Sequence, residues 1–251
     1  MDASIVIPVY GREELTDQVL RDLGKAAEDV ILVDNLGTYI PKVAVRELLA
    51  PGTNLGWAGG CNRGVEAARK YAPEYYCILN NDVRLSPQFI TGLIAGARAV
   101  GAAVIGPQYD HNWHHQRGQY LGHASNYIPH PRERLVPFVD GTCLMLSAAC
   151  LDQIGVLLDA VHWPVYGWGC DKDLCLRVRD SGGKVFVTER SYLNHLGRET
   201  VQHIDTFSEA PAELENDRGM RIKHGGEWQD RLFRGFDHLS RFGDTQLRLE
   251  T

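Results

Sequence analysis

The chain has 251 residues, of which 44% are hydrophobic and 23% charged, and its formal net charge is −6. These values are typical of a soluble globular protein with one large domain, and the negative charge argues against non-specific binding to nucleic acid. The six cysteines show no CxxC spacing, which favours buried reduced thiols over a zinc site.

The sequence shows neither a signal peptide nor a membrane span. Its start, Met-Asp-Ala-Ser-Ile-Val-Ile, has no basic n-region and runs directly into an apparent strand. The longest apolar stretch, residues 89–106, is interrupted by Arg98 and by glycines. We therefore expect a cytoplasmic protein, with association at a membrane surface as the alternative.

In the first half of the chain, short β-branched runs alternate with helical patterns, which indicates βαβ units and a mostly parallel sheet. Strands are expected at residues 4–9, 30–33, 75–79 and 102–105. Helices are expected at residues 12–25 and 59–71. Another helix is expected after Ser86-Pro87, with serine as the N-cap and proline at the first helical position.

The pattern becomes irregular at residues 108–137, a length typical of a functional loop or lid. His111, His114 and His115 in this segment suggest a metal as an alternative, although no carboxylate or cysteine partner is evident. Beyond it we expect a strand at residues 142–146, a helix from Ser147, strands at 183–187 and 192–195, and helical, charged sequence from about residue 208.

Polar side chains follow three of the expected strands. The segments are Pro8-Val9-Tyr10, Asp34-Asn35 and Asn80-Asn81-Asp82. One such segment alone is usually a turn. Three of them are harder to explain in that way, because ligands of open α/β sheets collect at the carboxyl ends of the strands.

A glycine-rich stretch, Asn54-Leu-Gly-Trp-Ala-Gly-Gly-Cys-Asn-Arg-Gly64, opens one of the expected helices. Its glycines allow close approach of the backbone to a ligand, and the following helix can direct amide groups at phosphate. It matches neither the dinucleotide fingerprint nor a P-loop. The asparagines at positions 54 and 62 favour ligand binding over a plain structural turn.

Two further features bear on chemistry. Asp82 is an oxygen ligand at a strand end, and His195, which ends a later strand, could join it on a divalent cation, with manganese favoured by the imidazole. A hydrogen-bonded core histidine is the alternative for His195. Asp171 and Asp173 follow a Gly/Trp turn at the start of a helix, where a carboxylate is stabilised and can act as a base. A charged helix start is the alternative for this pair.

Together these motifs resemble family 2 glycosyltransferases, most closely the bacterial rhamnosyl- and galactosyltransferase-like branch. The motifs occur in the family's order, and the resemblance covers roughly residues 3 to 200. It implies a GT-A-type, Rossmann-like α/β fold, with a mostly parallel sheet flanked by helices and a helical C-terminal extension. It also implies a transferase domain at residues 1–207, with donor half 1–106 and acceptor half 107–207, and an extension at 208–251.

The resemblance implies an inverting, metal-dependent transferase that uses a nucleotide-diphosphate sugar such as a UDP-sugar, with Mn²⁺ or Mg²⁺ as the cofactor. Asp171 is then the catalytic base, and Asp82 and His195 are the metal ligands. The residues expected to bind the donor are Pro8, Tyr10, Asp34, Asn35, Asn54, Gly59, Asn62, Asn80 and Asn81. Gly141, Thr142 and Trp168 are expected to bind the acceptor, and Trp113, Trp163 and Trp168 to stack on its rings.

The chain departs from the family pattern at two positions. Cys170 stands where the family commonly has an acidic residue, so Asp173 is an alternative base. Asn80 replaces an aspartate, which leaves Asp82 as the only carboxylate of the metal motif.

Two other functions stay open, a sugar-nucleotide nucleotidyltransferase and a non-catalytic nucleotide-sugar-binding protein. For the acceptor, a glycan or lipid-linked glycan is the first expectation, and a modified nucleobase or a protein side chain is the alternative. The basic side chains of the last 34 residues keep a polyanionic acceptor, nucleic acid included, open.

Overall fold

A computed structural model describes residues 2–110, 113–197 and 209–236. The strands are β1 Ala3–Val9, β2 Val30–Asp34, β3 Glu47–Leu49, β4 Tyr75–Leu79, β5 Val83–Leu85, β6 Val104–Tyr109, β7 Glu133–Leu135, β8 Cys143–Ser147 and β9 Val185–His195. The α-helices are α1 Glu13–Leu23, α2 Gly56–Ala68, α3 Phe89–Val100, α4 Ala148–Ile154, α5 Cys170–Asp180, α6 Glu209–His224 and α7 Trp228–Phe233. Short 3-10 helices lie at Gly24–Asp29, Arg69–Tyr71 and Ala124–Asn126.

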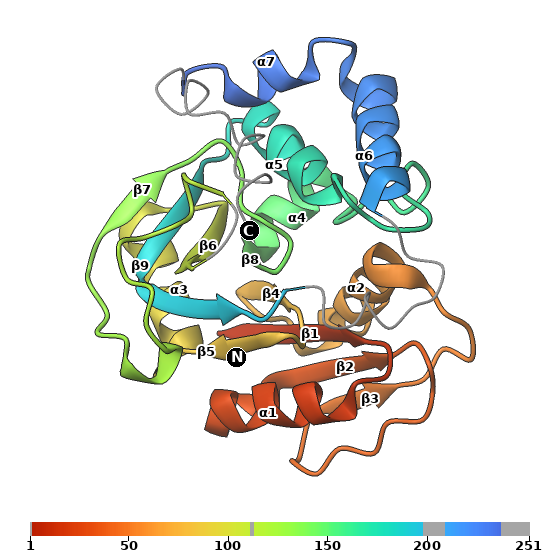
Figure 1. Ribbon diagram of the computed structural model, residues 1–251, viewed down its shortest axis with the longest axis vertical. Coiled ribbons are helices and arrows are strands. Elements are labelled where there is room, and N and C mark those ends of the chain that lie inside the picture. Colours follow the sequence, from red (N-terminus) through yellow and green to blue (C-terminus); the bar gives the residue numbers. More distant parts are fainter. Residues whose placement is uncertain (1, 111–112, 198–208, 237–251) are drawn as a thin grey trace.

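Within the described residues the nine strands form one curled sheet in the order β3-β2-β1-β4-β8-β6-β9-β5, and β7 pairs with β9 (Figure 1). Strands β3, β2, β1 and β4 are parallel, because α1 and α2 lie in the connections that return the chain to the same edge. Strand β8 joins β4 and β6 antiparallel, whereas β6 and β9 are parallel. The carboxyl ends of β1, β2 and β4 therefore lie side by side.

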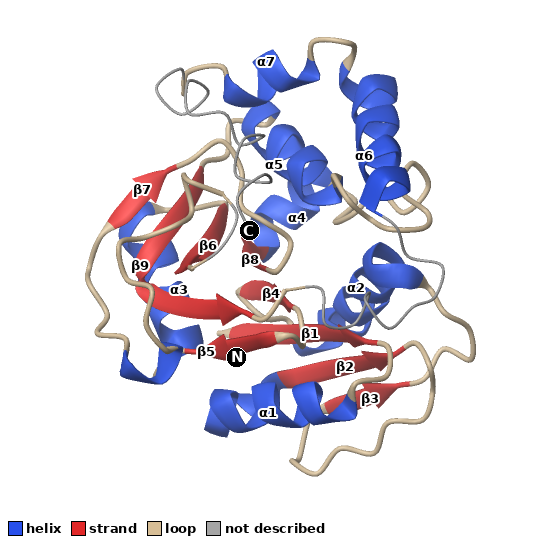
Figure 2. Ribbon diagram, in the orientation of Figure 1, coloured by secondary structure: helices blue, strands red, loops and turns tan. Residues whose placement is uncertain are grey.

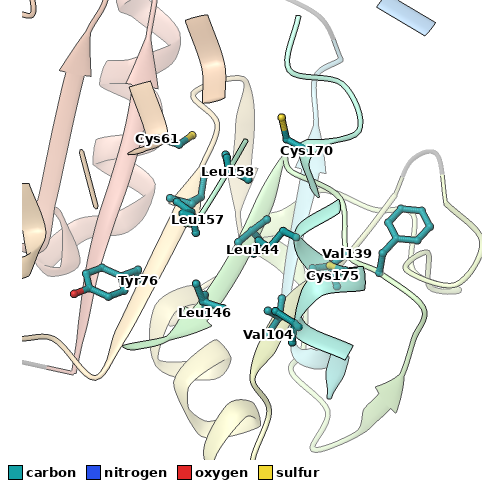
Figure 3. Close-up of a cluster of buried hydrophobic side chains, with 14 of the residues drawn as sticks. Cys61, Tyr76, Val104, Val139, Leu144, Leu146, Leu157, Leu158, Cys170 and Cys175 are labelled. Atoms are coloured by element: carbon teal, nitrogen blue, oxygen red, sulfur yellow. The ribbon is translucent and has the colours of Figure 1, made fainter. Parts of the chain in front are cut away.

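Helices cover both faces of the sheet (Figure 2), and each face has its own hydrophobic core. Side chains alternate between the two cores along a strand, as Ile5 and Val6 of β1 do. Burial on both faces explains the continuous apolar runs that predict these strands. Figure 3 shows part of the core on the α2 and α5 side, including Leu144 and Leu146 of β8.

Several element boundaries differ from the sequence expectations. Helix α2 begins at Gly56 rather than at Gly59, and the two late strands are one irregular strand, β9. Strands β3, β5 and β7 have only three residues each, too few to produce a periodic signal.

The expected N-cap at Ser86 is wrong. Gln88, in a left-handed conformation, precedes α3. Ser86 is buried, and its hydroxyl oxygen accepts the backbone N–H of Tyr192 at 3.0 Å. This serine therefore joins the end of β5 to β9 rather than capping a helix.

The C-terminal helices α6 and α7 lie over α5 (Figure 1), in agreement with the helical pattern of the sequence. Arg179 of α5 donates to the backbone carbonyls of Leu232 at 2.5 Å and Arg234 at 3.1 Å, which attaches the α7 region to α5. Residues 198–208 and 237–251, with Arg241 and Arg248, lie outside the described residues. Of the described helices, none combines the length and the apolar character needed to cross a membrane.

Candidate active site

The structure brings the three polar strand ends to one edge of the sheet. Tyr10 follows β1, and the backbone N–H of Asn35 donates to Val9 at 2.9 Å where β2 ends. The segment from Asn80 to Asp82 follows β4, on the other side of β1. Tyr10 is partly exposed, whereas Pro8 and Asp34 are buried. The sequence clusters thus form one continuous edge.

Asp34 and Asn35 shape the loops around this edge. Asp34 accepts the backbone N–H groups of Leu36 at 3.0 Å and Tyr39 at 2.7 Å, which folds the chain after β2. The Asn35 side chain accepts from Leu55 N at 3.1 Å and donates to the Gly56 carbonyl at 3.4 Å. Asn35 therefore fixes the start of α2 against the sheet.

The glycine-rich stretch approaches the strand ends closely. A Cβ on Gly60 would lie 3.0 Å from Pro8 Cβ and 3.2 Å from the Asn35 amide, so this helix turn is in close contact with β1. Asn54 is exposed, and its side chain accepts the N–H of Gly56 at 2.9 Å. Gly59 is partly exposed on the first turn of α2.

Asn62 is placed differently from its expected role at the donor. Its side chain donates to the carbonyl of Leu158 at 2.7 Å and accepts the Leu158 N–H at 3.0 Å. Both polar groups are therefore engaged by the loop before α5. Asn62 thus ties the glycine-rich helix to that loop, and its assignment to donor binding stays a prediction.

Asp82 and His195 face each other, with 3.5 Å between Asp82 Oδ2 and His195 Nε2. Two atoms that are each about 2.1 Å from one cation lie roughly 3.0–3.5 Å apart, so the separation fits a shared ion. Burial disfavours the charged imidazole, but the hydrogen bond to Asp82 and the neighbouring carboxylates raise the pKa of His195 overall. Asp110 accepts the backbone N–H of His195 at 3.1 Å and thereby positions it.

No group of three or more His, Cys, Asp or Glu side chains arranged to hold a metal occurs among the described residues. The donor set is thus one carboxylate and one imidazole, which suits a cation whose shell is completed by phosphate and water. Of the neighbouring amides, Asn81 donates to Thr16 Oγ1 at 3.1 Å and Asn80 accepts from Trp57 Nε1 at 2.8 Å.

Asp171 lies in the first turn of α5, where two backbone N–H groups hold its carboxylate. Gly141 N donates to Oδ2 at 3.0 Å, and Lys172 N donates to Oδ1 at 2.8 Å. Burial and the charge of Asp140 raise the pKa of Asp171 to about 6, against the opposing effects of Lys172 and the two N–H groups. Such a carboxylate is ionised at neutral pH and is more basic than an exposed aspartate.

Trp57 connects this carboxylate to the edge formed by the ends of β1, β2 and β4, although sequence reasoning did not select it. A Cβ on Gly141 would lie 2.6 Å from the Trp57 ring, and one on Gly167 would lie 3.2 Å from it. Its Nε1–H donates to Asn80. The sequence did offer a signal for Trp57, because it is a tryptophan inside a glycine-rich stretch. A large ring packs closely only where its neighbours are small, as Gly141 and Gly167 are.

The residues expected to bind the acceptor have mixed placements. Thr142 is buried, and both its N–H and its hydroxyl donate to Asp140 Oδ1, at 2.9 and 2.5 Å. Trp168 is partly buried directly before α5. Trp163 is buried in the core beside Gly219, so the expectation that it stacks on an acceptor ring is wrong.

Trp113, the other tryptophan expected on the acceptor side, donates to Asp140 Oδ2 at 2.8 Å. Among the residues that the structure describes, His114 and His115 belong to no group of three or more side chains that could hold a metal. His115 is buried with its Nε2 2.9 Å from the Phe138 carbonyl, and burial lowers its pKa to about 4. His111 lies outside the described residues.

Cys170 and Asp173, the two residues that bear on the choice of the base, are both buried. Cys170 lies in the core with Cys61 and Leu158 (Figure 3), and burial raises the pKa of its thiol. Asp173 is fully buried and binds Arg177, Lys223 and His224 at 2.8, 2.9 and 2.9 Å. Burial opposes ionisation of Asp173, but His224 and Arg177 lower its pKa. Asp173 therefore has the geometry of a structural ion pair.

Comparison with known proteins adds three findings. The model of a family described as "Glycosyl transferase family 2" matches residues 4–155. Uncharacterized proteins of Mycobacterium bovis and of two Mycobacterium tuberculosis strains are 36% identical over 226 residues, covering 88% of this chain and 85% of their own length.

The third finding is a solved structure, "Crystal structure of GalNAc-T7 with UDP, GalNAc and Mn2+", which aligns with a TM-score of 0.64 at 11% identity. The alignment covers 99% of this chain and 52% of that one, so this chain spans about half its length. At this identity the likeness concerns the fold, and it confirms the expected GT-A architecture.

Proposed function

The chain belongs to glycosyl transferase family 2, and from this premise we propose that it transfers a sugar from a nucleotide-diphosphate sugar to an acceptor hydroxyl, with inversion and with a divalent cation. One observation carries the proposal. The pair Asp82 and His195 lies at the donor edge, and Asp171, whose pKa is raised, is linked to that edge through Gly141 and Trp57.

The donor would lie along the edge formed by β1, β2 and β4. Tyr10, the partly exposed residue after β1, would line the base, and Asp34 would contact the ribose. Each Asp34 oxygen already accepts one N–H and keeps one further lone pair, so a ribose hydroxyl can still donate to it. Asn54 and Gly59 would border the diphosphate at the start of α2.

Asp82 and His195 would hold Mn²⁺ or Mg²⁺, as their 3.5 Å separation supports. The GalNAc-T7 structure contains both UDP and Mn2+, which supports use of such an ion in this fold. When bound, the cation supplies Lewis-acid neutralisation of the charge on the leaving diphosphate.

Asp171 would take the proton of the acceptor hydroxyl as that oxygen attacks the anomeric carbon. Its pKa of about 6 keeps it ionised at neutral pH while leaving it basic enough to accept a proton. The two backbone N–H groups orient the carboxylate before the acceptor arrives. Attack on the face opposite the leaving diphosphate inverts the anomeric centre through an oxocarbenium-like state.

The test is calorimetric titration of a panel of nucleotide-diphosphate sugars with and without Mn²⁺, followed by donor hydrolysis. We expect one donor class to bind in a metal-dependent way and to be hydrolysed slowly. Asp82→Asn should abolish the metal-dependent part, whereas Asp152→Asn, on an exposed side chain that pairs with Arg69, serves as a control. Absence of binding by every nucleotide sugar would contradict the proposal.

The proposal also includes five more specific features. They are the rhamnosyl- and galactosyltransferase-like branch, transfer of a hexose or deoxyhexose, a glycan or lipid-linked glycan as the acceptor, the cytoplasmic location and the domain division at residue 207. Trp113 and Trp168 are the remaining candidates for stacking on acceptor rings, since Trp163 is buried.

A further inference from the structure

Strands β7 and β9 lie toward the end of the sheet opposite β3 (Figure 1). A cavity of about 900 Å³ is lined by residues of these strands and of the loop beside them. Its wall comes mainly from the irregular segment between β6 and β7, together with Glu189 of β9. The donor residues and Asp171 do not line it. The proposed transfer reaction therefore leaves this cavity without a role.

The cavity is positively charged. Arg117, Arg132 and Arg134 line it, and Glu189 is the only carboxylate among its lining residues in the described part of the chain. Arg132 Nη1 and Arg134 Nε both lie 3.8 Å from Glu189 Oε1, beyond hydrogen-bond distance. Arg134 Nη2 also donates to the Arg117 carbonyl at 3.5 Å, and these two acceptors leave most donors of the three guanidinium groups available to a ligand.

The electrostatic environment of Arg134 also favours binding of an anion in the cavity. Burial lowers the pKa of this guanidinium, Glu189 partly offsets the effect, and the charge of Arg132 adds to it. A bound anion would offset both unfavourable effects. Guanidinium groups bind carboxylate and phosphate through paired N–H donors, so an oxyanion is the complementary ligand.

The cavity is much larger than a single oxyanion, and part of its wall is apolar. The side chains of Leu121 and Ile128 line it and are 58% and 72% exposed. The ring of Tyr120, which packs against Tyr127 and Tyr192, also lines the cavity and adds to this apolar part of the wall. We propose that this cavity binds a phosphate or carboxylate group carried by a carbohydrate acceptor, an inference that rests on the proposed transferase function.

The wall of the cavity is connected to the proposed base. His114 and Arg117 line the cavity. Their neighbours in the chain, Trp113 and Gln116, form hydrogen bonds with Asp140. Trp113 Nε1 donates to Asp140 Oδ2 at 2.8 Å, and the Asp140 N–H donates to Gln116 Oε1 at 2.9 Å. Asp140 directly precedes Gly141, whose N–H donates to Asp171, so an acceptor that reaches both places would contact one continuous wall.

The same segment is attached to the metal end of the site. Ala124 N donates to Asn194 Oδ1 at 2.7 Å, next to His195. Glu189 and His195 belong to the same strand, β9, in which Thr188 and Tyr192 pair with the consecutive β6 residues Pro107 and Gln108, so β9 bulges between the cavity and the metal ligands. Neither the proposed metal ligands nor Asp171 lines the cavity, so the oxyanion would belong to a part of the acceptor away from the donor diphosphate.

The test is a calorimetric titration of glucose 6-phosphate, glucuronate, glucose and inorganic phosphate into the full chain, with and without UDP and Mn²⁺. We expect the two anionic sugars to bind in both conditions and glucose to fail. The double variant Arg117→Gln/Arg132→Gln should weaken anionic-sugar binding about tenfold or more, the loss expected when a charged hydrogen bond is removed. Arg98→Gln, an exposed arginine paired with Glu74 away from the cavity, is the matched control.

Unchanged binding of the anionic sugars by the double variant, or no binding by the wild-type protein, would overturn the inference. Inorganic phosphate binding as tightly as glucose 6-phosphate would also overturn it, because the site would then read a free anion and not a sugar. Thermal unfolding of the double variant verifies that it is folded. UDP binding with Mn²⁺ is measured in the same protein, so failure of the cavity inference with intact UDP binding leaves the proposed function standing.

Discussion

The donor edge of the sheet and the first turn of α5 acquire their polar groups in different ways. At the donor edge, each polar segment lies at the carboxyl end of a strand, and the pairing of β2, β1 and β4 brings these ends together. At the start of α5, the partners come from distant parts of the chain, Gly141 for Asp171 and Lys223 and His224 for Asp173.

This difference determines the chemistry of the two aspartates. Asp171 and Asp173 are two residues apart on one helical turn, yet the pKa of Asp171 is raised to about 6 while that of Asp173 is lowered. Asp171 meets backbone N–H groups and the like charge of Asp140, whereas Asp173 meets three basic side chains. A carboxylate near a helix start thus becomes a base or a structural anchor according to its tertiary neighbours.

The largest expected effect is on the rate of sugar transfer, which should depend on Asp171 as the proposed base. Asp171→Asn removes the proposed base, so kcat for sugar transfer should fall by about 10²–10⁴-fold. The affinity for UDP with Mn²⁺ should stay within a factor of about two, since Asp171 does not belong to the donor edge. Steady-state kinetics and calorimetry measure the two quantities. Normal transfer by this variant would remove Asp171 from the mechanism.

The next largest effect is on the free energy of unfolding, which should depend on Asp173. Asp173→Asn removes the charge of the fully buried carboxylate that pairs with Arg177 and His224, and breaking such a buried ion pair costs about 3–5 kcal/mol in the free energy of unfolding. Urea denaturation measures this cost. Asp180→Asn is the matched control on the same helix, because its exposed pair with Arg231 is expected to contribute less than about 1 kcal/mol. Equal losses in the two variants would contradict the structural role of Asp173.

A smaller effect concerns pH. Asp171 must be ionised to accept a proton, so kcat/KM should rise with pH up to about 6 and then level, with an about tenfold loss at one pH unit below. The raised pKa also means that the folded state holds this proton longer than the unfolded state. The contribution of Asp171 to the free energy of unfolding is therefore greatest below about pH 3.8, and it is lost as the pH rises to about 6.

The control for the pH profile is the residual activity of Asp171→Asn, which should lack that acidic limb. The difference in unfolding free energy between wild type and variant should shift in favour of the variant between pH 4 and 7. A wild-type profile that is flat down to about pH 4 would contradict the raised pKa of Asp171.

The sequence predicted the parallel strands and their polar ends because these features are local. A buried strand needs a continuous apolar run, and the residues after it turn the chain at the same edge. For the same reason the family motifs were recognisable, and both the family and the GT-A fold are confirmed. The short strands β5 and β7 and the cap of α3 were missed because pairing with β9 decides them.

The roles of Asn62, Cys170 and Asp173 depend on contacts that no sequence spacing encodes. Asn62 and Leu158 are 96 residues apart, and Asp173 and His224 are 51 apart. Such contacts arise only when helices and loops pack onto the finished sheet, and that packing sets burial and charge at each carboxylate. The sequence alone therefore determined that Asp171 and Asp173 begin a helix, and the tertiary structure decided which of them meets backbone N–H groups and which is held by basic side chains.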